Sequence, residues 1–209
     1  MDQPQPASDR RPLPARPAGL GALADALRAL EPSCGPVRLV AVDGHAGSGK
    51  STLAGHLSAA TGGAPVLHLD DLATHDEMFD WTDRFNDQVL TPLAHGRTAR
   101  YGVYDWVRRG FTRREELPPA PLVIVEGVGS GRCALRPHLA RLLWLEVPEH
   151  LAWKRGRRRD GPGLSGFWDA WTDAERKHFA ADPSRPYADV LVRQGFEGYV
   201  VLPGPAATA

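Results

Sequence analysis

The fold of this chain is decided by the stretch Gly44-His45-Ala46-Gly47-Ser48-Gly49-Lys50-Ser51. This stretch fits the pattern Gly-x-x-x-x-Gly-Lys-Ser/Thr. It lies between residues 37–42, an apolar run that predicts a buried strand, and residues 50–60, whose apolar residues recur at helical spacing. Glycines let the backbone curl so that its N–H groups point at phosphate oxygens, and the following helix presents its positive N-terminal end to the same anion. The stretch therefore predicts a loop that binds the phosphates of a nucleoside triphosphate.

The expected cofactors are ATP and Mg²⁺, although the loop does not distinguish ATP from GTP. Lys50 can reach the β- and γ-phosphates, and the Ser51 hydroxyl can ligate Mg²⁺. The alternative is a chance glycine-rich turn before an ordinary helix, which would require strand, loop and helix to fall in register by accident. We expect the nucleotide to be held by Gly44, His45, Ala46, Gly47, Ser48, Gly49, Lys50, Ser51 and Thr52.

The composition narrows the class of protein. The 209 residues suffice for one α/β domain and leave little for a second. Acidic and basic residues balance at 25 each, and this lack of a basic excess argues against a protein that wraps nucleic acid. Cys34 and Cys133 have no Cys-x-x-Cys spacing, so we expect neither a zinc site nor a disulfide scaffold. Without an apolar run of about 20 residues or an apolar export signal, we expect a cytoplasmic protein that does not enter a membrane.

Strands and helices alternate along the sequence. After residues 37–42, strands are predicted at residues 66–69, 122–125, 142–147, 190–192 and 199–202. Helices are predicted at residues 20–30, 50–60 and 84–95, from Pro148 into an arginine cluster, and at residues 167–181. This alternation predicts parallel βαβ units that bind ligands at the carboxyl ends of the strands. The Pro-rich residues 1–18 are predicted to be a disordered tail, residues 19–203 a single domain, and residues 204–209 a frayed end.

Carboxylates follow two of the predicted strands. Asp70 and Asp71 come after residues 66–69, where a carboxylate would face the γ-phosphate and accept a proton from an attacking hydroxyl or hold a metal-bound water. Glu126 follows residues 122–125, the arrangement of a Walker B acid that serves Mg²⁺ directly or through water. The alternative for the aspartates is a helix cap or a solvated turn. The expected Mg²⁺ ligands are Ser51, Glu126 and Asp70, and the expected base is Asp70 or Asp71.

The middle of the chain is dense in aromatic residues. Such side chains can stack on a flat base while polar groups beside them hydrogen-bond a sugar; core packing is the alternative for each of them. Asp105 and Arg109 could face a substrate hydroxyl or phosphate, and the alternative is a surface ion pair worth under about 1 kcal/mol. Of Trp168 and Trp171, one is expected to pack and the other to cover the site. The aromatic residues of the middle segment are Trp81, Phe85, Tyr101, Tyr104 and Trp106.

A strongly basic run at residues 154–160 precedes a Gly-Pro-Gly break. A mobile arginine-rich segment suits a lid that closes on ATP, neutralises the charge that develops in phosphoryl transfer and excludes water. We expect this lid over residues 155–166, with Arg155 and Arg158 on the nucleotide and Arg159 in catalysis. The alternatives are a solvated charged face or contact with RNA, which the neutral overall charge disfavours.

In their order along the chain, these motifs resemble those of the uridine kinase-like branch of P-loop kinases, which includes uridine-cytidine kinases and nicotinamide riboside kinases. The resemblance extends over residues 37–193. The ordered combination is more specific than the phosphate loop, which many families share. The matching segments are Val42-Asp43-Gly44 through Ser51-Thr52, Asp70-Asp71-Leu72, Phe79 through Asp87, Tyr104-Asp105-Trp106, Ile124-Val125-Glu126-Gly127, Arg158-Arg159-Asp160 and Tyr187-Ala188-Asp189-Val190.

The resemblance implies an ATP-dependent kinase that transfers the γ-phosphoryl group to a hydroxyl of a small molecule, with a nucleoside foremost. It implies the P-loop kinase fold, in which α/β/α layers surround a five-stranded, mostly parallel sheet with a small lid. Many members of the family are oligomers, but nothing in the sequence marks an interface. The implied catalytic residues are Asp70, Lys50 and Arg159, and the implied substrate residues are Asp71, Phe85, Asp87, Tyr104, Asp105 and Arg109.

The sequence departs from the family pattern on the acceptor side. Asn86 stands where nucleoside kinases have an acid, with Asp87 one place on, and Arg109 lies near the place of a frequent His. An arginine there would suit a phosphorylated or acidic acceptor, so nicotinamide riboside, another vitamin precursor or an antibiotic-like alcohol stay open. The alternative from a different class is an NTP-binding regulatory or accessory protein that hydrolyses nucleotide only slowly.

Overall fold

The computed structural model of the protein describes residues 19–196 and 198–207. The predicted disordered tail, residues 1–18, lies outside the described residues, as do residues 208–209. The part of the predicted frayed end that is described is tied to the body of the domain. Gly204 and Ala206 donate backbone hydrogen bonds to the carbonyl oxygens of Asp189 and Ala188, at 2.8 and 3.1 Å.

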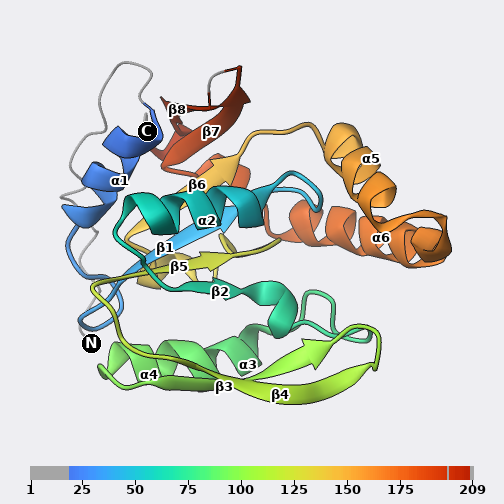
Figure 1. Cartoon of the computed structure of the whole chain (residues 1–209), viewed down its shortest axis with the longest axis horizontal. Coiled ribbons are helices and arrows are strands. Elements are labelled where there is room, and N and C mark those ends of the chain that lie inside the picture. Colours follow the sequence, from blue (N-terminus) through green and yellow to red (C-terminus); the bar gives the residue numbers. More distant parts are fainter. Residues whose placement is uncertain (1–18, 197, 208–209) are drawn as a thin grey trace.

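A six-stranded sheet forms the centre of the molecule (Figure 1). Its strand order is β2-β5-β1-β6-β7-β8, and all neighbours are parallel except β7 and β8. The predicted α/β fold with a mostly parallel sheet is confirmed. The sheet has six strands rather than five, because β8 turns back along β7 in antiparallel pairing. The strands are β1 (Arg38–Asp43), β2 (Val66–His68), β5 (Leu122–Glu126), β6 (Arg141–Leu145), β7 (Val190–Gly195) and β8 (Gly198–Pro203).

Helices cover both faces of the sheet, which gives three layers. The α1 helix (Leu20–Arg28) and the α2 helix (Lys50–Ala60) pack on one face, and α3 (Thr82–Phe85) and α4 (Thr91–Ala94) pack on the other. Successive side chains of a strand point to opposite faces, so each strand contributes to both hydrophobic clusters. In the described part of the chain, no helix is both long enough and apolar enough to cross a membrane.

Two further helices stand at the carboxyl-end edge of the sheet, beside the loop from which α2 begins (Figure 1). They are α5 (Glu149–Asp160) and α6 (Ser165–Ala181), and residues 161–164 connect them. Pro148 is the N-cap of α5, as its fixed φ allows. These two helices carry the residues of the predicted lid.

The middle segment differs from the single helix predicted for residues 84–95. The α3 helix continues through a π-helical turn, Asn86–Leu90, into α4. A hairpin that the sequence pattern does not predict then follows, formed by β3 (Ala99–Asp105) and β4 (Gly110–Leu117) as a separate two-stranded sheet. Most of β4 is exposed, so it lacks the alternation of apolar and polar residues that marks a half-buried strand.

Candidate functional site

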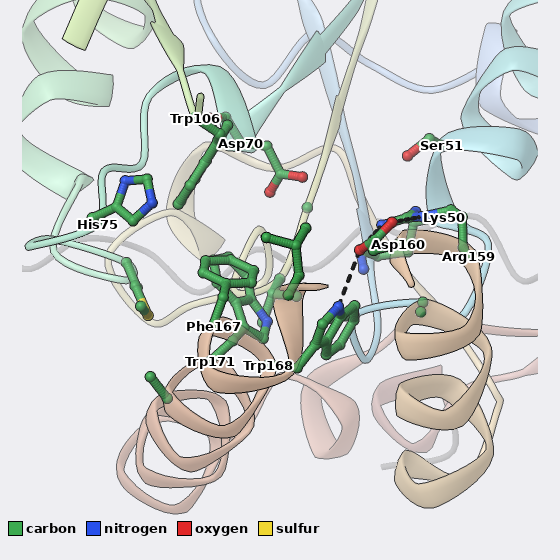
Figure 2. Close-up of a pocket in the computed structure, with 18 of the residues that line it drawn as sticks. Lys50, Ser51, Asp70, His75, Trp106, Arg159, Asp160, Phe167, Trp168 and Trp171 are labelled. Atoms are coloured by element: carbon green, nitrogen blue, oxygen red, sulfur yellow. Dashed lines mark hydrogen bonds and ion pairs between the residues drawn. The ribbon is translucent and has the colours of Figure 1, made fainter. Parts of the chain in front are cut away.

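A cavity of about 1240 Å³ opens at the carboxyl ends of the central strands (Figure 2). The segments that line it are far apart in the sequence: the loop before α2, the ends of β2 and β5, the β3–β4 turn, and α5 and α6. This is the edge at which parallel α/β sheets bind ligands. From the predicted phosphate loop and the start of α2, the lining residues are Ala46, Gly47, Gly49, Lys50, Ser51 and Thr52.

The backbone of the loop depends on its glycines. Gly44, Gly47 and Gly49 have φ angles of 149°, 77° and 100°, which L side chains rarely adopt. Gly47 is also confined by space, because a Cβ there would lie 2.3 Å from the carbonyl oxygen of Ala152 on α5. The α2 helix begins at Lys50 directly after the loop, so its N-terminal N–H groups are available to an anion at the cavity.

Lys50, Ser51 and Glu126 meet beside the loop. The ammonium of Lys50 donates to the carbonyl oxygen of His45 at 3.0 Å, and the Ser51 hydroxyl donates to Oε1 of Glu126 at 2.9 Å. Nδ1 of His68 lies 2.5 Å from the same Oε1. Burial acts to raise the pKa of Glu126, but the hydrogen bond from His68 and the charge of Lys50 outweigh it and lower the pKa on balance. Glu126 is therefore held in its charged form.

Ser51 and Glu126 fit Mg²⁺ by the chemistry of their oxygens. Mg²⁺ is held in proteins by one or two carboxylates together with substrate phosphates and water, rather than by a cage of protein ligands. No group of three or more His, Cys, Asp or Glu side chains that could hold a metal occurs among residues 19–196 and 198–207. Ser51 and Glu126 could therefore form only part of an Mg²⁺ coordination shell, which nucleotide phosphates and water would have to complete.

Asp70 faces the phosphate loop across the cavity. It follows β2 in a short 3₁₀ turn, and its carboxylate points into the cavity opposite Lys50 and Ser51 (Figure 2). The carboxylate opens onto the cavity, but the surrounding protein atoms shield it from bulk water and raise its pKa. The charge of Glu126 adds to this shift, and the charge of Lys50 opposes it. A carboxylate with a raised pKa is a stronger base than a solvated one, which suits proton transfer from a hydroxyl.

An aromatic wall made of His75, Trp106, Phe167 and Trp171 closes the side of the cavity away from the loop (Figure 2). The ring centroid of Trp106 lies 4.9 Å from that of His75, 5.7 Å from that of Phe167 and 5.9 Å from that of Trp171. The indole N–H of Trp106 also donates to the backbone carbonyl oxygen of Asp70 at 3.1 Å. The wall is therefore joined to the segment that carries Asp70.

The predicted lid is only partly directed at the cavity. Arg155 and Arg159 line it, whereas Arg158 is exposed elsewhere on α5. Arg159 pairs with Asp160, with its Nε 2.6 Å from the Asp160 carboxylate, and this hydrogen bond raises the pKa of Arg159. Arg155 and Arg159 are thus the two arginines of the predicted lid that line the cavity.

The expectation that only one of Trp168 and Trp171 covers the site is wrong. Both line the cavity, because residues three apart on a helix share a face. The Trp168 ring packs on Gly156 of α5 so closely that a Cβ there would lie 2.1 Å from it. Trp168 therefore joins the two helices of the predicted lid, while Trp171 belongs to the aromatic wall.

Several predicted acceptor residues do not reach the cavity. Phe85 is completely buried in the hydrophobic core between the sheet and the middle segment. Asp87 is exposed on the helical segment and does not line the cavity. Asp71 also lies outside the lining residues and interacts with the charges of His68 and Arg113. Of the two candidate bases, only Asp70 is in the cavity.

The other three predicted acceptor residues lie at the β3–β4 turn, and each of them has different surroundings. The Tyr104 hydroxyl bonds Nδ1 of His75 at 2.9 Å, so Tyr104 supports the aromatic wall from behind. The Asp105 carboxylate accepts the backbone N–H groups of residues 107 and 108, at 2.9 and 2.8 Å, and these bonds lower its pKa and close the turn. Arg109 does line the cavity, and it has a left-handed backbone with φ of 57°.

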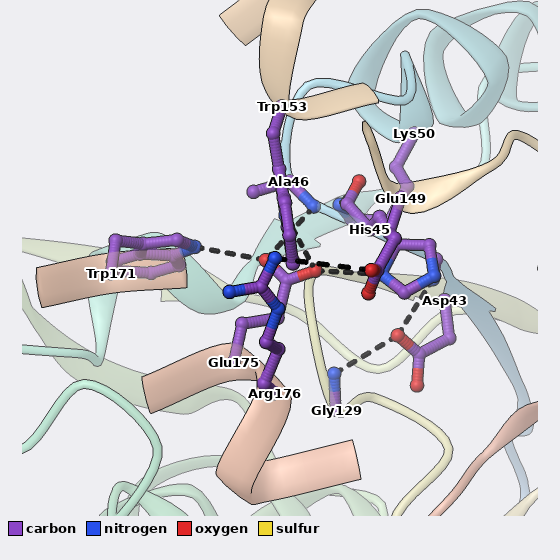
Figure 3. A network of polar contacts seen from close by, with 11 residues as sticks. Asp43, His45, Ala46, Lys50, Gly129, Glu149, Trp153, Trp171, Glu175 and Arg176 are labelled. Carbon is purple, nitrogen blue, oxygen red and sulfur yellow. Dashed lines mark hydrogen bonds and ion pairs between the residues drawn. The ribbon is translucent and has the colours of Figure 1, made fainter. Parts of the chain in front are cut away.

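Two buried carboxylates that are not among the predicted site residues support the loop (Figure 3). Asp43, at the end of β1, accepts backbone N–H groups from Gly44, Gly129 and Gly131 at 2.7, 2.9 and 2.8 Å. Glu175, on α6, accepts hydrogen bonds from the phosphate loop itself. The one sequence signal for Glu175 is its position four residues after a Trp and four before a Phe, on the apolar face of a helix.

Solved structures share this fold. A possible uridine kinase from Bacillus stearothermophilus matches with a TM-score of 0.61 and 19% identity, over 82% of this chain and 96% of that chain. A candidate fructose transport system kinase from Silicibacter sp. TM1040 matches with a TM-score of 0.56 and 24% identity, over 78% of this chain and 89% of that chain. Comparison with protein-family models and with curated proteins finds no match. The likeness shows that this chain shares the α/β fold of these structures, with its mostly parallel central sheet.

Proposed function

We propose that this chain is an ATP-dependent kinase that transfers the γ-phosphoryl group to a hydroxyl of a small molecule, with a nucleoside as the lead acceptor. The observation that carries the proposal is the shared cavity. The phosphate loop and the aromatic wall face each other across it, and Asp70 lies between them (Figure 2). The aromatic wall borders the space beside the expected γ-phosphate, and this space supports the binding of a second, small ligand there. A nucleotide switch would instead present an exposed partner surface.

Five polar side chains of the cavity divide this transfer between them. Asp70 accepts the proton of the acceptor hydroxyl as its oxygen attacks the γ-phosphorus, and the bond from that phosphorus to the bridging oxygen of ADP breaks. Lys50 and Arg159 stabilise the negative charge on the transferred group and on the departing ADP. Mg²⁺ at Ser51 and Glu126 would neutralise phosphate charge.

The aromatic wall favours an acceptor with a flat ring. Indole and phenyl faces bind a heterocycle over its whole area, whereas a sugar alone would contact them less completely. One structural neighbour is named as a possible uridine kinase and the other as a candidate fructose transport system kinase, so these names do not choose between a nucleoside and a sugar for this chain. Arg109 on the same cavity supports a second candidate, an acceptor that carries a phosphate or carboxylate.

The test is ADP release from ATP and Mg²⁺ across a panel of nucleosides, riboside vitamins, sugars and small alcohols, with the product masses determined. We expect ADP release that depends on the acceptor, and a product heavier by one phosphoryl group. Tight ATP binding with the same slow ADP release for every compound would contradict a kinase for these acceptors and support a nucleotide-dependent regulator.

A further inference from the structure

Glu175 is fully buried, and N–H donors surround its carboxylate on all sides (Figure 3). Oε1 bonds Nδ1 of His45 at 2.7 Å and accepts the indole N–H of Trp153 at 3.1 Å. Oε2 accepts the backbone N–H of Ala46 at 3.2 Å and the indole N–H of Trp171 at 3.1 Å. A buried carboxylate is costly unless its lone pairs are satisfied, and each of these two oxygens has two partners. The surroundings are therefore built for a carboxylate.

The partners of Glu175 come from three parts of the site. His45 and Ala46 belong to the phosphate loop, Trp153 to α5, and Trp171 to the aromatic wall on α6. Side chains of α5 and α6 therefore meet the loop at a single carboxylate. The loop has no regular secondary structure before α2 begins, so its position depends on contacts of this kind.

The contacts of Glu175 continue to Lys50. The Lys50 ammonium donates to the carbonyl oxygen of His45, and Glu175 holds the imidazole of the same residue. The next N–H along the loop, that of Ala46, is held by the other oxygen of Glu175. Glu175 on α6 therefore contacts the same loop segment, His45 and Ala46, to which the Lys50 ammonium is hydrogen-bonded.

We propose that Glu175 is a positioning residue that keeps the phosphate loop in the conformation that receives nucleotide, acting through His45 and Ala46. This inference rests on the proposed function, because it assigns a nucleotide to the loop. Glu175 is not a lining residue of the cavity, so its effect on a ligand passes through the loop. Without the carboxylate, the loop occupies further conformations, and the apparent affinity falls in proportion to the competent fraction.

The substitution Glu175→Gln tests this role at nearly constant volume. A glutamine amide has one acceptor oxygen and one NH₂ donor. In either orientation its NH₂ group faces the indole N–H of Trp153 or of Trp171, where the carboxylate accepted a bond. The variant therefore removes at least one hydrogen bond of the Glu175 carboxylate without creating a cavity.

The experiment measures the affinity of the full chain for MgADP and for inorganic tripolyphosphate by titration calorimetry. Neither measurement needs an acceptor or turnover. We expect E175Q to bind both ligands about tenfold more weakly, because both depend on the loop. We expect H45A to weaken both ligands too, and the double variant to lose little beyond the weaker single variant, since both residues act through one contact.

The matched control is Asp173→Asn on the same helix. Asp173 is exposed, lies outside the cavity and pairs with Lys177 at 2.7 Å, so D173N should bind both ligands like the wild type. Thermal melting by circular dichroism verifies that each variant is folded at the assay temperature. A merely structural role for Glu175 would lower the melting temperature and leave the two affinities unchanged.

The outcomes separate this inference from the proposed function. A folded E175Q with wild-type affinity for both ligands overturns the positioning role, and additive losses in the double variant overturn the route through His45. If E175Q does not fold, H45A tests the inference instead. Weaker binding of the two ligands by H45A would support the route through His45, and unchanged binding would overturn it. A wild-type chain that binds neither ligand refutes nucleotide binding itself, and the kinase proposal fails first.

Discussion

The two ends of the cavity are built in different ways. The phosphate end is built mainly on one contiguous stretch, residues 44–52, to which Glu126, Arg155 and Arg159 add their side chains. The acceptor end is an aromatic wall assembled from the segment after β2, the β3–β4 turn and α6. A site made of consecutive residues is recognisable as a motif, whereas a site made of distant side chains exists only in the folded chain. Substitutions at the phosphate end should therefore change the nucleotide affinity, and substitutions at the acceptor end should change the acceptor KM.

The largest effect is expected where the two ends meet, at Asp70. Replacing Asp70 with Asn should lower kcat by about 100- to 10,000-fold, because the amide cannot accept the hydroxyl proton. The affinity for MgADP should stay within about twofold, since the base acts in the transition state. Steady-state kinetics and calorimetry measure the two quantities. Full activity in D70N would refute this assignment, and Asp71→Asn would be the next variant to measure.

The next largest effect belongs to the phosphate end. Lys50→Ala should weaken MgADP binding and also lower kcat by about 100-fold, because the ammonium contacts phosphates in the ground state and in the transition state. Lys154→Ala is the matched control, as this exposed lysine on α5 does not line the cavity. Equal kinetics for the two alanine variants would contradict the assignment of the loop.

A smaller effect is expected at the acceptor end. Phe167→Ala should raise the acceptor KM by about tenfold and leave MgADP affinity unchanged, because a stacking surface is lost. Phe85→Leu is the comparison, since Phe85 lies in the core. It should cost about 1 kcal/mol of unfolding free energy without changing the acceptor KM. The opposite pattern, with KM raised in F85L and not in F167A, would place the acceptor elsewhere.

The smallest effect concerns His178 on α6, behind the aromatic wall. Burial, together with the charge of Arg132, lowers the pKa of His178 although Asp43, Asp182 and Glu175 oppose the shift. Below a pH of about 6.5 the unfolded chain binds the proton first, so the free energy of unfolding should fall as the pH decreases. Urea unfolding between about pH 5 and pH 7 measures this, and His178→Asn should flatten the dependence. An unchanged slope would contradict a neutral, half-buried His178.

Local sequence signals predict the elements that form the phosphate end of the site. The loop, the start of α2 at Lys50, the acids after β2 and the acid that ends β5 each depend on a few consecutive residues. The same signals could not distinguish Asp70 from Asp71, because the two residues differ only in which side chain points into the cavity. Only the folded chain places Asp70 in the cavity.

The acceptor end lacked such signals. Phe85 and Phe167 are both phenylalanines on helices, and only packing makes one a core residue and the other a cavity wall. Asp105 resembles a substrate ligand in sequence, but its Oδ1 accepts two backbone N–H groups of the hairpin turn. The sequence pattern does not predict this hairpin, because most of β4 is exposed. Glu175 is a single acid on an apolar helix face, and its partners are 129 and 130 residues away in the loop.

The most direct measurement is a crystal structure of the chain with MgADP and a compound that the acceptor panel identifies as a substrate. We expect the β-phosphate in the loop beside Lys50, and the reactive hydroxyl of the compound within about 3 Å of the Asp70 carboxylate. The rest of the compound should lie against Trp106, Phe167 and Trp171. A compound bound outside this cavity, or with its hydroxyl turned away from Asp70, would contradict the proposed phosphoryl transfer to a small acceptor.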